Sequence, residues 1–384
     1  MRILICTYST ASDIFATVPL AWALRSAGHE VLYAGGGDGM RECAKAGFPY
    51  VDLAPDVDLT EPFRRRAEQT GTSGQLVWYR SGVIEEADVS SAVTLFGELS
   101  DLVAPGAVSL ARRWRPELVV STDIQGSGPL IASLLSVPLV PLSHLLALVP
   151  DMVERLRGAM AATYDHYGVS GAPRLVQPVR TTPLSMNPQR SDHLPMRHIP
   201  YNGSYLDVGS LPDWLMREPR RHRVLLTLGT FVPKYGGLAV LPELMDQLES
   251  VDAEFVLALG DVDQEQIPPV PSNVRLEGWL PLNAVLGSCS TVVHHGGSGT
   301  TLAALCAGVP QIILAHGADQ HFNAHVVARR GLGVAADRTQ LTAELIARAL
   351  ASPELARTAA EVQEEIQAMP TPRETAALLE DIVK

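Results

Sequence analysis

The sequence is poor in cysteine and in aromatic side chains. It has only four cysteines, with no C-x-x-C pair among them, and scattered cysteines of this kind are typical of small buried side chains in a reducing compartment. Aromatic residues make up 5% of the 384 residues. Ala, Leu and Val are abundant instead, which favours α/β layers over a β-sandwich.

Positive charge and long hydrophobic runs are also scarce. Thirty Lys and Arg stand against 42 Asp and Glu, for a net charge of −12, and we expect neither a nucleic-acid nor a membrane partner because both need clustered positive charge. No apolar run approaches the roughly 20 residues that cross a bilayer. The chain enters a predicted strand directly after Arg2, without a signal-peptide pattern. We therefore expect a cytoplasmic protein, and the sequence leaves a homodimer open.

Apolar runs of strand length alternate with helical patterns along the chain. Residues 2–9 predict a strand, residues 18–27 a helix that Gly28 ends, and residues 30–34 a second strand. Such continuous apolar runs are typical of a parallel sheet covered on both faces. After a proline-rich stretch the rhythm restarts. Further strands are predicted at residues 118–121, 139–142, 224–228, 255–259, 274–276, 291–294 and 311–314.

The length is sufficient for two cores. We expect an N-terminal domain over residues 1–200, a linker over 201–222 and a second domain over 223–365. A C-terminal helix over 366–384 is expected to pack back on the first domain. Between about residues 56 and 100 the pattern loosens, so that surface helices and loops or a ligand-binding insertion remain equal alternatives.

The most informative segment is His294–Asn323, where an apolar strand leads into His-His-Gly-Gly-Ser-Gly-Thr before a helix. Glycines let the backbone approach a ligand closely, and the unpaired N–H groups at a helix start bind phosphate. Thr300 adds a hydroxyl donor and His295 an imidazole donor. The segment therefore predicts a diphosphate site whose positive potential comes from backbone dipoles and one histidine. An ordinary glycine-rich turn is the alternative.

Three other sites can be drawn on the same segment. A P-loop requires a lysine after its glycines, and none follows here. A dinucleotide fingerprint fits Gly297 and Gly299, but Leu302 stands where the third glycine belongs. A helix start with a donor-rich loop already neutralises a diphosphate, so a metal is less favoured. The metal site would use His316, Asp319, His321 and His325.

Taken together, these motifs resemble the nucleotide-sugar signature of GT-B glycosyltransferases, in particular the antibiotic and macrolide branch related to plant secondary-product transferases. The resemblance covers essentially the whole chain, including residues 201–203 and 211–215, which resemble the family's linker. It implies an α/β fold of two Rossmann-like, doubly wound parallel-sheet domains facing each other across a cleft. It also implies an inverting, metal-independent enzyme without a cofactor. The expected reaction moves a (deoxy)sugar from a dTDP- or UDP-sugar to a small polyketide-type or aromatic aglycone in antibiotic biosynthesis.

The resemblance assigns roles to residues of this sequence. Trp279 would stack on the nucleotide base, and the backbone near Leu280 would read its edge. Asp319 and Gln320 would bind hydroxyls of the donor sugar. Diphosphate contacts are expected from Thr230, His295, Gly297, Ser298, Gly299 and Thr300. Acceptor contacts are expected from Trp78, Tyr79 and His144.

The sequence departs from its relatives at the catalytic base. The family's histidine lies six residues before the proline that opens the first helix, and counting back from Pro19 gives Asp13. Some antibiotic transferases carry aspartate there, so we predict that Asp13 is the general base. A carboxyl with an ordinary pKa of about 3.9 is a weak base, and burial or a nearby carboxylate would raise that pKa.

Alternatives to this catalytic interpretation remain. Asp13 could instead cap a helix that starts near Ile14. We expect Asp123 to lie across the cleft from Asp13, in an orienting or electrostatic role. The loss of the histidine also leaves open a protein that binds nucleotide-sugars without transfer, either a scaffold or an epimerase-like enzyme.

Overall fold

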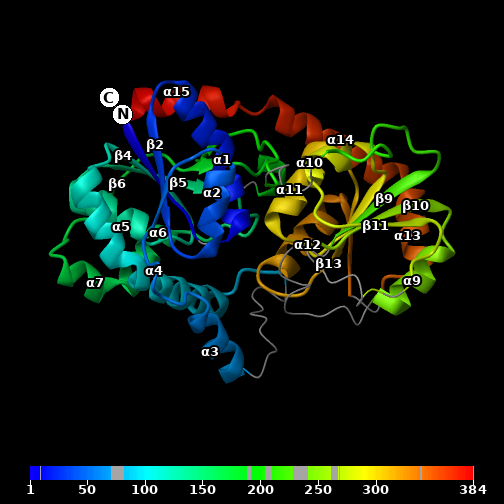
Figure 1. Ribbon diagram of the computed structural model, residues 1–384, viewed down its shortest axis with the longest axis horizontal. Helices are drawn as coiled ribbons and strands as arrows, with labels where there is room; N and C mark the ends of the chain where they lie inside the picture. Colours follow the sequence, from blue (N-terminus) through cyan, green and yellow to red (C-terminus); the bar gives the residue numbers. More distant parts are fainter. Residues whose placement is uncertain are drawn as a thin grey trace. The chain divides into compact units, whose positions relative to one another are not determined.

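The computed structural model describes residues 1–8, 10–70, 82–187, 192–203, 210–227, 241–260, 267, 269–337 and 340–383. The chain divides into two compact units, and each contains a parallel sheet flanked by helices (Figure 1). The first unit consists of Met1–Gln69, Ile84–Arg197 and Met369–Lys384. The second consists of Thr70–Val83 and His198–Ala368.

The sheet of the first unit has the order β3-β2-β1-β4-β5-β7-β8, with β6 paired to β5. Its central strands are continuous apolar runs because helices cover both faces, and β4 is buried at every position. The strands are β1 (Arg2–Cys6), β2 (Glu30–Gly35), β3 (Tyr50–Asp52), β4 (Leu118–Thr122), β5 (Pro138–Ser143), β6 (Arg174–Leu175), β7 (Val179–Arg180) and β8 (Leu194–Pro195). The α-helices are α1 (Ala11–Ser26), α2 (Arg41–Lys45), α3 (Glu61–Thr70), α4 (Glu86–Trp114), α5 (Ser127–Leu135), α6 (Met152–Ala159), α7 (Ala161–His166) and α15 (Pro372–Val383).

The strand order of the first sheet reverses between β1 and β4. The chain runs outward from β1 to β2 and β3, and later from β4 to β5 in the opposite direction. β1 and β4 are parallel neighbours, with Cys6 opposite Ser121. Segments that leave the carboxyl ends of such a pair diverge and open a crevice, where ligands of α/β proteins usually bind.

Helix α1 begins seven residues earlier than the sequence predicted. Thr10 is its N-cap residue, and Pro19 lies inside the helix instead of opening it. Proline removes one backbone donor, and the apolar face formed by residues such as Ile14 and Leu20 is fully buried around it. Asp13 therefore lies in the first turn of α1, and the alternative of a cap for a helix starting near Ile14 is wrong.

Helix α4 is longer and more apolar than expected from the sequence. An 18-residue window of this 29-residue helix has a mean hydropathy of 1.2, so its length and composition alone would allow it to cross a bilayer. Within the protein 56% of that window is buried, and α4 packs against α5 and α6. The expectation that no apolar run approaches membrane-spanning length is wrong for α4, and burial in the core of the first unit explains its apolar face.

The sheet of the second unit has the order β11-β10-β9-β12-β13-β14, which reverses between β9 and β12. Both faces are covered: Val224 and Leu226 of β9 join one core cluster, and Leu225 joins another. The strands are β9 (His222–Thr227), β10 (Ala253–Ala258), β11 (Val274–Glu277), β12 (Thr291–His294), β13 (Gln311–Leu314) and β14 (Gly333–Ala336). The helices are α9 (Leu241–Glu249), α10 (Leu282–Val285), α11 (Ser298–Ala307), α12 (Gln320–Arg330), α13 (Ala343–Leu350) and α14 (Pro353–Ala368).

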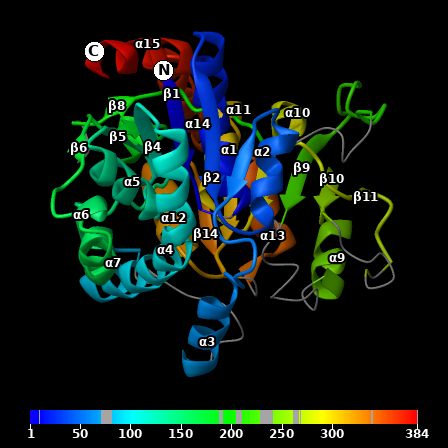
Figure 2. The same cartoon turned by 60° about the vertical axis from the view of Figure 1, so that its left-hand side comes forward.

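The C-terminal helix α15 lies against α1 in the first unit (Figures 1 and 2). The His29 Nε2 atom is 2.6 Å from a carboxylate oxygen of Glu380, and the Arg197 N–H donates to the Pro370 carbonyl at 2.7 Å. The chain returns to the first unit at Met369, and the second unit begins at His198. The domain boundaries drawn from the sequence, after residues 200, 222 and 365, stay predictions.

Two helical glycines of the first unit form a matched pair for a stability test. A Cβ on Gly106 of α4 would lie 2.0 Å from the Leu53 carbonyl oxygen, whereas a Cβ on Gly158 of α6 would meet nothing within 4 Å. We expect Gly106→Ala to lower the free energy of unfolding by about 1–3 kcal/mol through overpacking. Gly158→Ala should leave it unchanged or raise it by up to about 1 kcal/mol through helix propensity. Urea denaturation followed by circular dichroism measures both, and equal midpoints would contradict this close approach.

Candidate active site

The start of helix α11 presents three backbone donors. Gly297 precedes the helix in an extended conformation, and the first helical hydrogen bond runs from the Thr301 N–H to the Gly297 carbonyl at 3.0 Å. Within the described residues, the N–H groups of Ser298, Gly299 and Thr300 have no partner. With the positive end of the helix dipole they form an anion site.

His294 fixes the shape of the loop that leads into α11. The Gly296 N–H donates to its Nδ1 atom at 3.1 Å, so this nitrogen carries no proton. The proton is therefore on Nε2, which donates to the Gln311 Oε1 atom at 2.8 Å. Gly296 has a φ of +90°, which favours glycine. The loop geometry is thus determined by a buried histidine of one defined tautomer.

His295 contributes a neutral imidazole to the loop. Its ring lies over Gly297, where a Cβ would be only 2.6 Å from the Nε2 atom. Burial, with help from His294 and His316, lowers the pKa of His295 to about 3. Its ring therefore offers a hydrogen-bond donor without a positive charge. Its Nδ1 atom is buried and has no partner among the described residues.

A buried network fixes Asp319 behind this loop. Its Oδ2 atom accepts from the Ser298 hydroxyl at 2.8 Å and from the Asn323 side chain at 3.0 Å, and Asn323 also donates to the Gly296 carbonyl at 2.8 Å. Burial raises the pKa of Asp319. The Ser298 hydroxyl is held within the protein, so Ser298 offers an incoming anion its backbone N–H and not its side chain. The Oδ1 atom of Asp319 has no partner within the described residues.

Gln320 lies beside Asp319 at the start of α12. Its Oε1 atom accepts from the His316 N–H at 2.8 Å and the Gly317 N–H at 3.1 Å. Its amide NH₂ group makes no hydrogen bond with the described residues. The pair thus combines an acceptor oxygen on Asp319 with a donor amide on Gln320, the groups that a pair of vicinal hydroxyls requires. Asp319 precedes α12 without making a side-chain cap bond.

Trp279 and Leu280 follow β11, the outer strand at the other end of the sheet from β14. Trp279 is half-buried, and Leu280 is 5% exposed within a core cluster. The adjacent Glu277 accepts from the Trp214 indole N–H at 2.7 Å. The ring of Trp214 also lies under the guanidinium of Arg223, at 4.9 Å. The linker residue Trp214 is therefore tied to the strand that carries Trp279.

Several predicted residues receive no structural account. Thr230, Trp78 and Tyr79 lie outside the described residues.

Among the residues that are described, no group of three or more His, Cys, Asp and Glu side chains could hold a metal ion. The four residues of the metal alternative are therefore not gathered into such a group.

In the first unit, Asp13 lies at the point where the order of strands reverses. Its side chain is 3% exposed. The Oδ2 atom accepts from the Tyr8 N–H at 2.6 Å, after β1, and from the Thr122 hydroxyl at 2.7 Å, at the end of β4. Residues from both sides of the crevice thus hold one carboxylate.

The environment of Asp13 raises the pKa of its carboxyl toward neutrality. Burial raises its pKa to about 7, the hydrogen bonds from Thr122 and Tyr8 oppose this rise, and the negative charge of Asp123 adds to it. A general base is most effective when its pKa lies near the working pH. Asp123 therefore acts electrostatically on Asp13, while its predicted role in catalysis stays a prediction.

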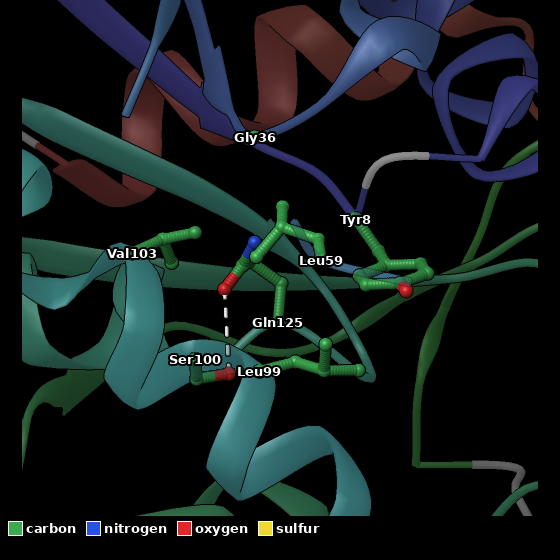
Figure 3. A pocket seen from close by; sticks show the side chains of 7 residues that line it. All are labelled: Tyr8, Gly36, Leu59, Leu99, Ser100, Val103 and Gln125. Carbon is green, nitrogen blue, oxygen red and sulfur yellow. Dashed lines mark hydrogen bonds between the residues drawn. The ribbon is translucent and has the colours of Figure 1, made fainter. Parts of the chain in front are cut away.

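A small pocket in the first unit is lined in part by Tyr8, whose backbone N–H donates to Asp13 (Figure 3). The pocket is partly open to solvent and has room for little more than one water-sized group. The Tyr8 ring forms one wall and packs edge-on against Phe96 at 5.6 Å between centroids. Its lining residues are Tyr8, Gly36, Leu59, Leu99, Ser100, Val103 and Gln125.

The side chains of Gln125 and Ser100 in the pocket already make hydrogen bonds within the protein. Gln125 donates to the Thr7 carbonyl at 2.9 Å and accepts from the Ser127 N–H at 3.0 Å. Ser100 donates to the Phe96 carbonyl at 2.6 Å. The pocket therefore presents a mainly apolar surface.

His144 is not among these lining residues. It follows β5 and is 5% exposed, and burial lowers its pKa to about 4. Its Nδ1 atom has no partner in the described part of the chain. It does not line the pocket, so its predicted acceptor role stays a prediction.

Comparison with known proteins gives matches along the whole chain. A family model described as erythromycin biosynthesis protein CIII-like, N-terminal domain, matches residues 22–229, and the C-terminal domain of that family matches residues 242–382. The elloramycin glycosyltransferase ElmGT of Streptomyces olivaceus is 35% identical over 99% of this chain and 97% of its own length. The chain belongs to the erythromycin biosynthesis protein CIII-like family of glycosyltransferases.

Solved structures of glycosyltransferases agree with this membership. SnogD from Streptomyces nogalater is 38% identical, with a TM-score of 0.86 that covers 100% of this chain and 99% of that chain. SsfS6 from Streptomyces sp. SF2575, complexed with thymidine diphosphate, is 29% identical, with a TM-score of 0.81 over 99% of both chains. The predicted GT-B fold of two parallel-sheet α/β domains is confirmed.

Sequence reasoning missed several residues around the site of this CIII-like chain. Thr122 directly follows a predicted strand, and the carboxyl ends of neighbouring parallel strands meet at one edge, so its position carried a signal. Tyr8 acts through its backbone N–H, which no residue type reveals. The pocket residues Leu59, Leu99 and Val103 lie in or near the loosely patterned region, where the sequence gave no periodicity to place them.

Burial of the Asp13 carboxylate should oppose folding at high pH. Its pKa is raised from 3.8 to about 7, so the stability that its protonated form contributes is fully present below about pH 4 and lost as the pH rises through about 7. We expect the neutral variant Asp13→Asn to be more stable than the wild type at pH 8, by at most about 4 kcal/mol at about 1.4 kcal/mol per pKa unit.

The measurement is urea unfolding at pH 8, 6 and 4, at which the difference should shrink in that order. Asp123→Asn serves as the control, because Asp123 is less buried than Asp13 and should change stability less. A difference that is the same at all three pH values would contradict a buried carboxyl with a near-neutral pKa.

Proposed function

We propose that this chain is an inverting glycosyltransferase that moves a deoxysugar from a dTDP- or UDP-sugar to a polyketide-type or aromatic aglycone in antibiotic biosynthesis. We place it in the cytoplasm, with no metal ion taking part. One observation carries the proposal. A carboxylate with a pKa of about 7 lies at one strand-order reversal, and a set of free backbone N–H donors lies at the other. Family membership and the thymidine diphosphate bound to the relative SsfS6 favour a nucleoside diphosphate as the leaving group.

The donor is proposed to bind along the carboxyl edge of the second sheet. Trp279 follows β11 and the loop of His295 follows β12, three strand spacings away, or about 14 Å at about 4.8 Å per spacing. An elongated nucleotide can therefore contact both, with its base on the Trp279 ring and its diphosphate on the N–H groups of residues 298–300. Thr230 would add its predicted contact. Asp319 and Gln320 offer their free oxygen and amide to the sugar hydroxyls.

The transfer step is proposed as a single displacement. The acceptor oxygen, or a ring carbon ortho to a phenol, attacks the anomeric carbon from the face opposite the phosphate and gives its proton to Asp13. The bond between the anomeric carbon and the diphosphate oxygen breaks, and its electron pair stays on the leaving diphosphate. The helix dipole and donors at the start of α11 stabilise that charge, which is why no metal is required.

The small apolar pocket of the first unit is proposed to receive a methyl-sized group at the edge of the acceptor. Tyr8 both lines this pocket and donates its N–H to Asp13, so a molecule seated there lies near the base. The occupied polar groups of Ser100 and Gln125 suit an alkyl substituent or ring edge better than a charged group.

The catalytic proposal predicts that kcat and the affinity for the donor nucleotide respond differently to two substitutions. Asp13→Asn should lower kcat by about 100- to 10,000-fold, the usual contribution of a general base, and leave the Kd for TDP unchanged. His295→Ala should weaken TDP binding and lower kcat, since its donor contacts the diphosphate in the ground state and the transition state. Kinetics with a panel of dTDP- and UDP-sugars and aromatic acceptors, with calorimetry of TDP, measures both.

Three outcomes of this experiment would contradict the proposal. An Asp13→Asn enzyme with near-normal turnover would exclude Asp13 as the base. Donor binding without acceptor-dependent release of nucleoside diphosphate would favour a scaffold. Loss of turnover in the presence of a chelator, restored by a divalent cation, would exclude the metal-independent reaction.

The acceptor pocket can be narrowed by one methyl group. A Cβ on Gly36 would lie 2.6 Å from the Leu59 Cδ1 atom and 3.1 Å from the Val103 Cγ1 atom. We expect Gly36→Ala to raise the KM for the acceptor by about tenfold, the usual order of effect of one carbon group in an apolar pocket, with the KM for the donor unchanged. Gly171→Ala is the control, because a Cβ there meets nothing within 4 Å. Equal acceptor KM values in the two variants would place the acceptor elsewhere.

A further inference from the structure

The two hydrogen bonds to Asp13 converge on one of its carboxylate oxygens. The Tyr8 N–H and the Thr122 hydroxyl both donate to Oδ2, at 2.6 and 2.7 Å. The other oxygen, Oδ1, has no partner among the described residues. A proton on Oδ2 would disturb both hydrogen bonds, whereas a proton on Oδ1 leaves them intact. The geometry therefore distinguishes the two oxygens of the base.

Thr122 supplies the side-chain contact of this pair. It is the last residue of β4, is 3% exposed, and reaches Asp13 from the opposite side of the strand-order reversal. The turn after it is fixed because the Gln125 N–H donates to the Thr122 carbonyl at 3.2 Å and the Ser121 hydroxyl donates to the Gln125 carbonyl at 3.0 Å. Thr122 is thus held rigidly while its hydroxyl points at the carboxylate.

We propose that Thr122 is a positioning residue of the transfer reaction, whose hydroxyl holds Asp13 Oδ2 so that Oδ1 receives the acceptor proton. This inference rests on the proposed role of Asp13 as the base. The acceptor O–H bond breaks, its proton binds Oδ1, and Oδ2 keeps both of its hydrogen bonds throughout.

The charges around Asp13 give this hydroxyl a measurable effect. Burial and the carboxylate of Asp123 raise the pKa of Asp13, while the Thr122 and Tyr8 hydrogen bonds lower it. Asp123, on the loop after β4, is the charged side chain that acts on Asp13 within the described residues. Tyr8, on the loop after β1, is the other titratable residue in contact, and its ring packs against Phe96. Removing the Thr122 hydroxyl therefore raises the pKa of Asp13 further.

The test compares Thr122→Val, which keeps the shape and removes the hydroxyl, with Thr122→Ser, which keeps the hydroxyl. Activity depends on the ionised base, so it is present above the pKa of Asp13 and lost as the pH falls through it. In the pH profile of kcat, we expect Thr122→Val to shift the fall at acidic pH to a pH about one unit higher. The reason is that a hydrogen bond to a charged group is lost. At pH 7 its kcat should fall by up to about tenfold and recover at higher pH. Thr122→Ser should restore the wild-type pH profile.

Two further measurements separate positioning from a structural effect. Infrared titration of the carboxyl band that Asp13→Asn removes should show the same upward shift in Thr122→Val without any turnover. The Kd for TDP should stay unchanged in both Thr122 variants. If Thr122→Val does not fold, Thr122→Ala gives the same comparison with a smaller side chain.

The possible failures are distinguishable. A Thr122→Val enzyme with an unchanged pH profile and an unchanged carboxyl titration overturns the role of Thr122, while a dead Asp13→Asn enzyme still supports the base. Normal turnover in Asp13→Asn overturns the proposed function itself. An upward shift that Thr122→Ser does not correct also overturns the role of the hydroxyl.

Discussion

The reversal of strand order in a parallel sheet is the constraint on which the rest of this molecule depends. Neighbouring strands such as β1 and β4 end at the same edge, yet the segments that follow them leave in opposite directions. Backbone and side-chain groups at that point are left without regular partners, and a ligand can reach them. The chain uses this geometry twice: Asp13 meets Thr122 at one reversal, and His295 begins its loop at the other.

Both reversals solve the problem of charge in the same way. Asp13 is buried, and Asp319, which follows β13, is half-buried. The pKa of each carboxyl is raised, and each accepts two hydrogen bonds on Oδ2. Two donors on one oxygen fix the orientation of a carboxylate and leave its other oxygen for a ligand. The loop of His295 adds donors without adding a cation, because its imidazole is neutral. An acidic protein can in this way offer an anion site built from dipoles.

Much of the fold could be predicted because buried strands in a parallel sheet leave continuous apolar runs. The predicted strands at residues 291–294 and 311–314 coincide with β12 and β13. Helix α1 was misjudged because a proline normally marks a first turn, whereas packing of its apolar face tolerates Pro19 within the helix. The length of helix α4 was not predicted. Scattered charges on its exposed face interrupt the apolar pattern that its buried face forms.

The sequence by itself determined the kinds of groups available: a glycine-rich loop before a helix, an acid–amide pair, and an aspartate in the first turn of the first helix. Those choices are local, because residue type and spacing decide how the backbone turns and which atoms can donate or accept. Only the tertiary structure decided that Thr122 reaches Asp13, that the Ser298 hydroxyl turns inward to Asp319, and that one carboxylate is buried enough to have a pKa of about 7. Burial and contacts between residues 109 positions apart depend on strand pairing and core packing, which no short stretch of sequence contains.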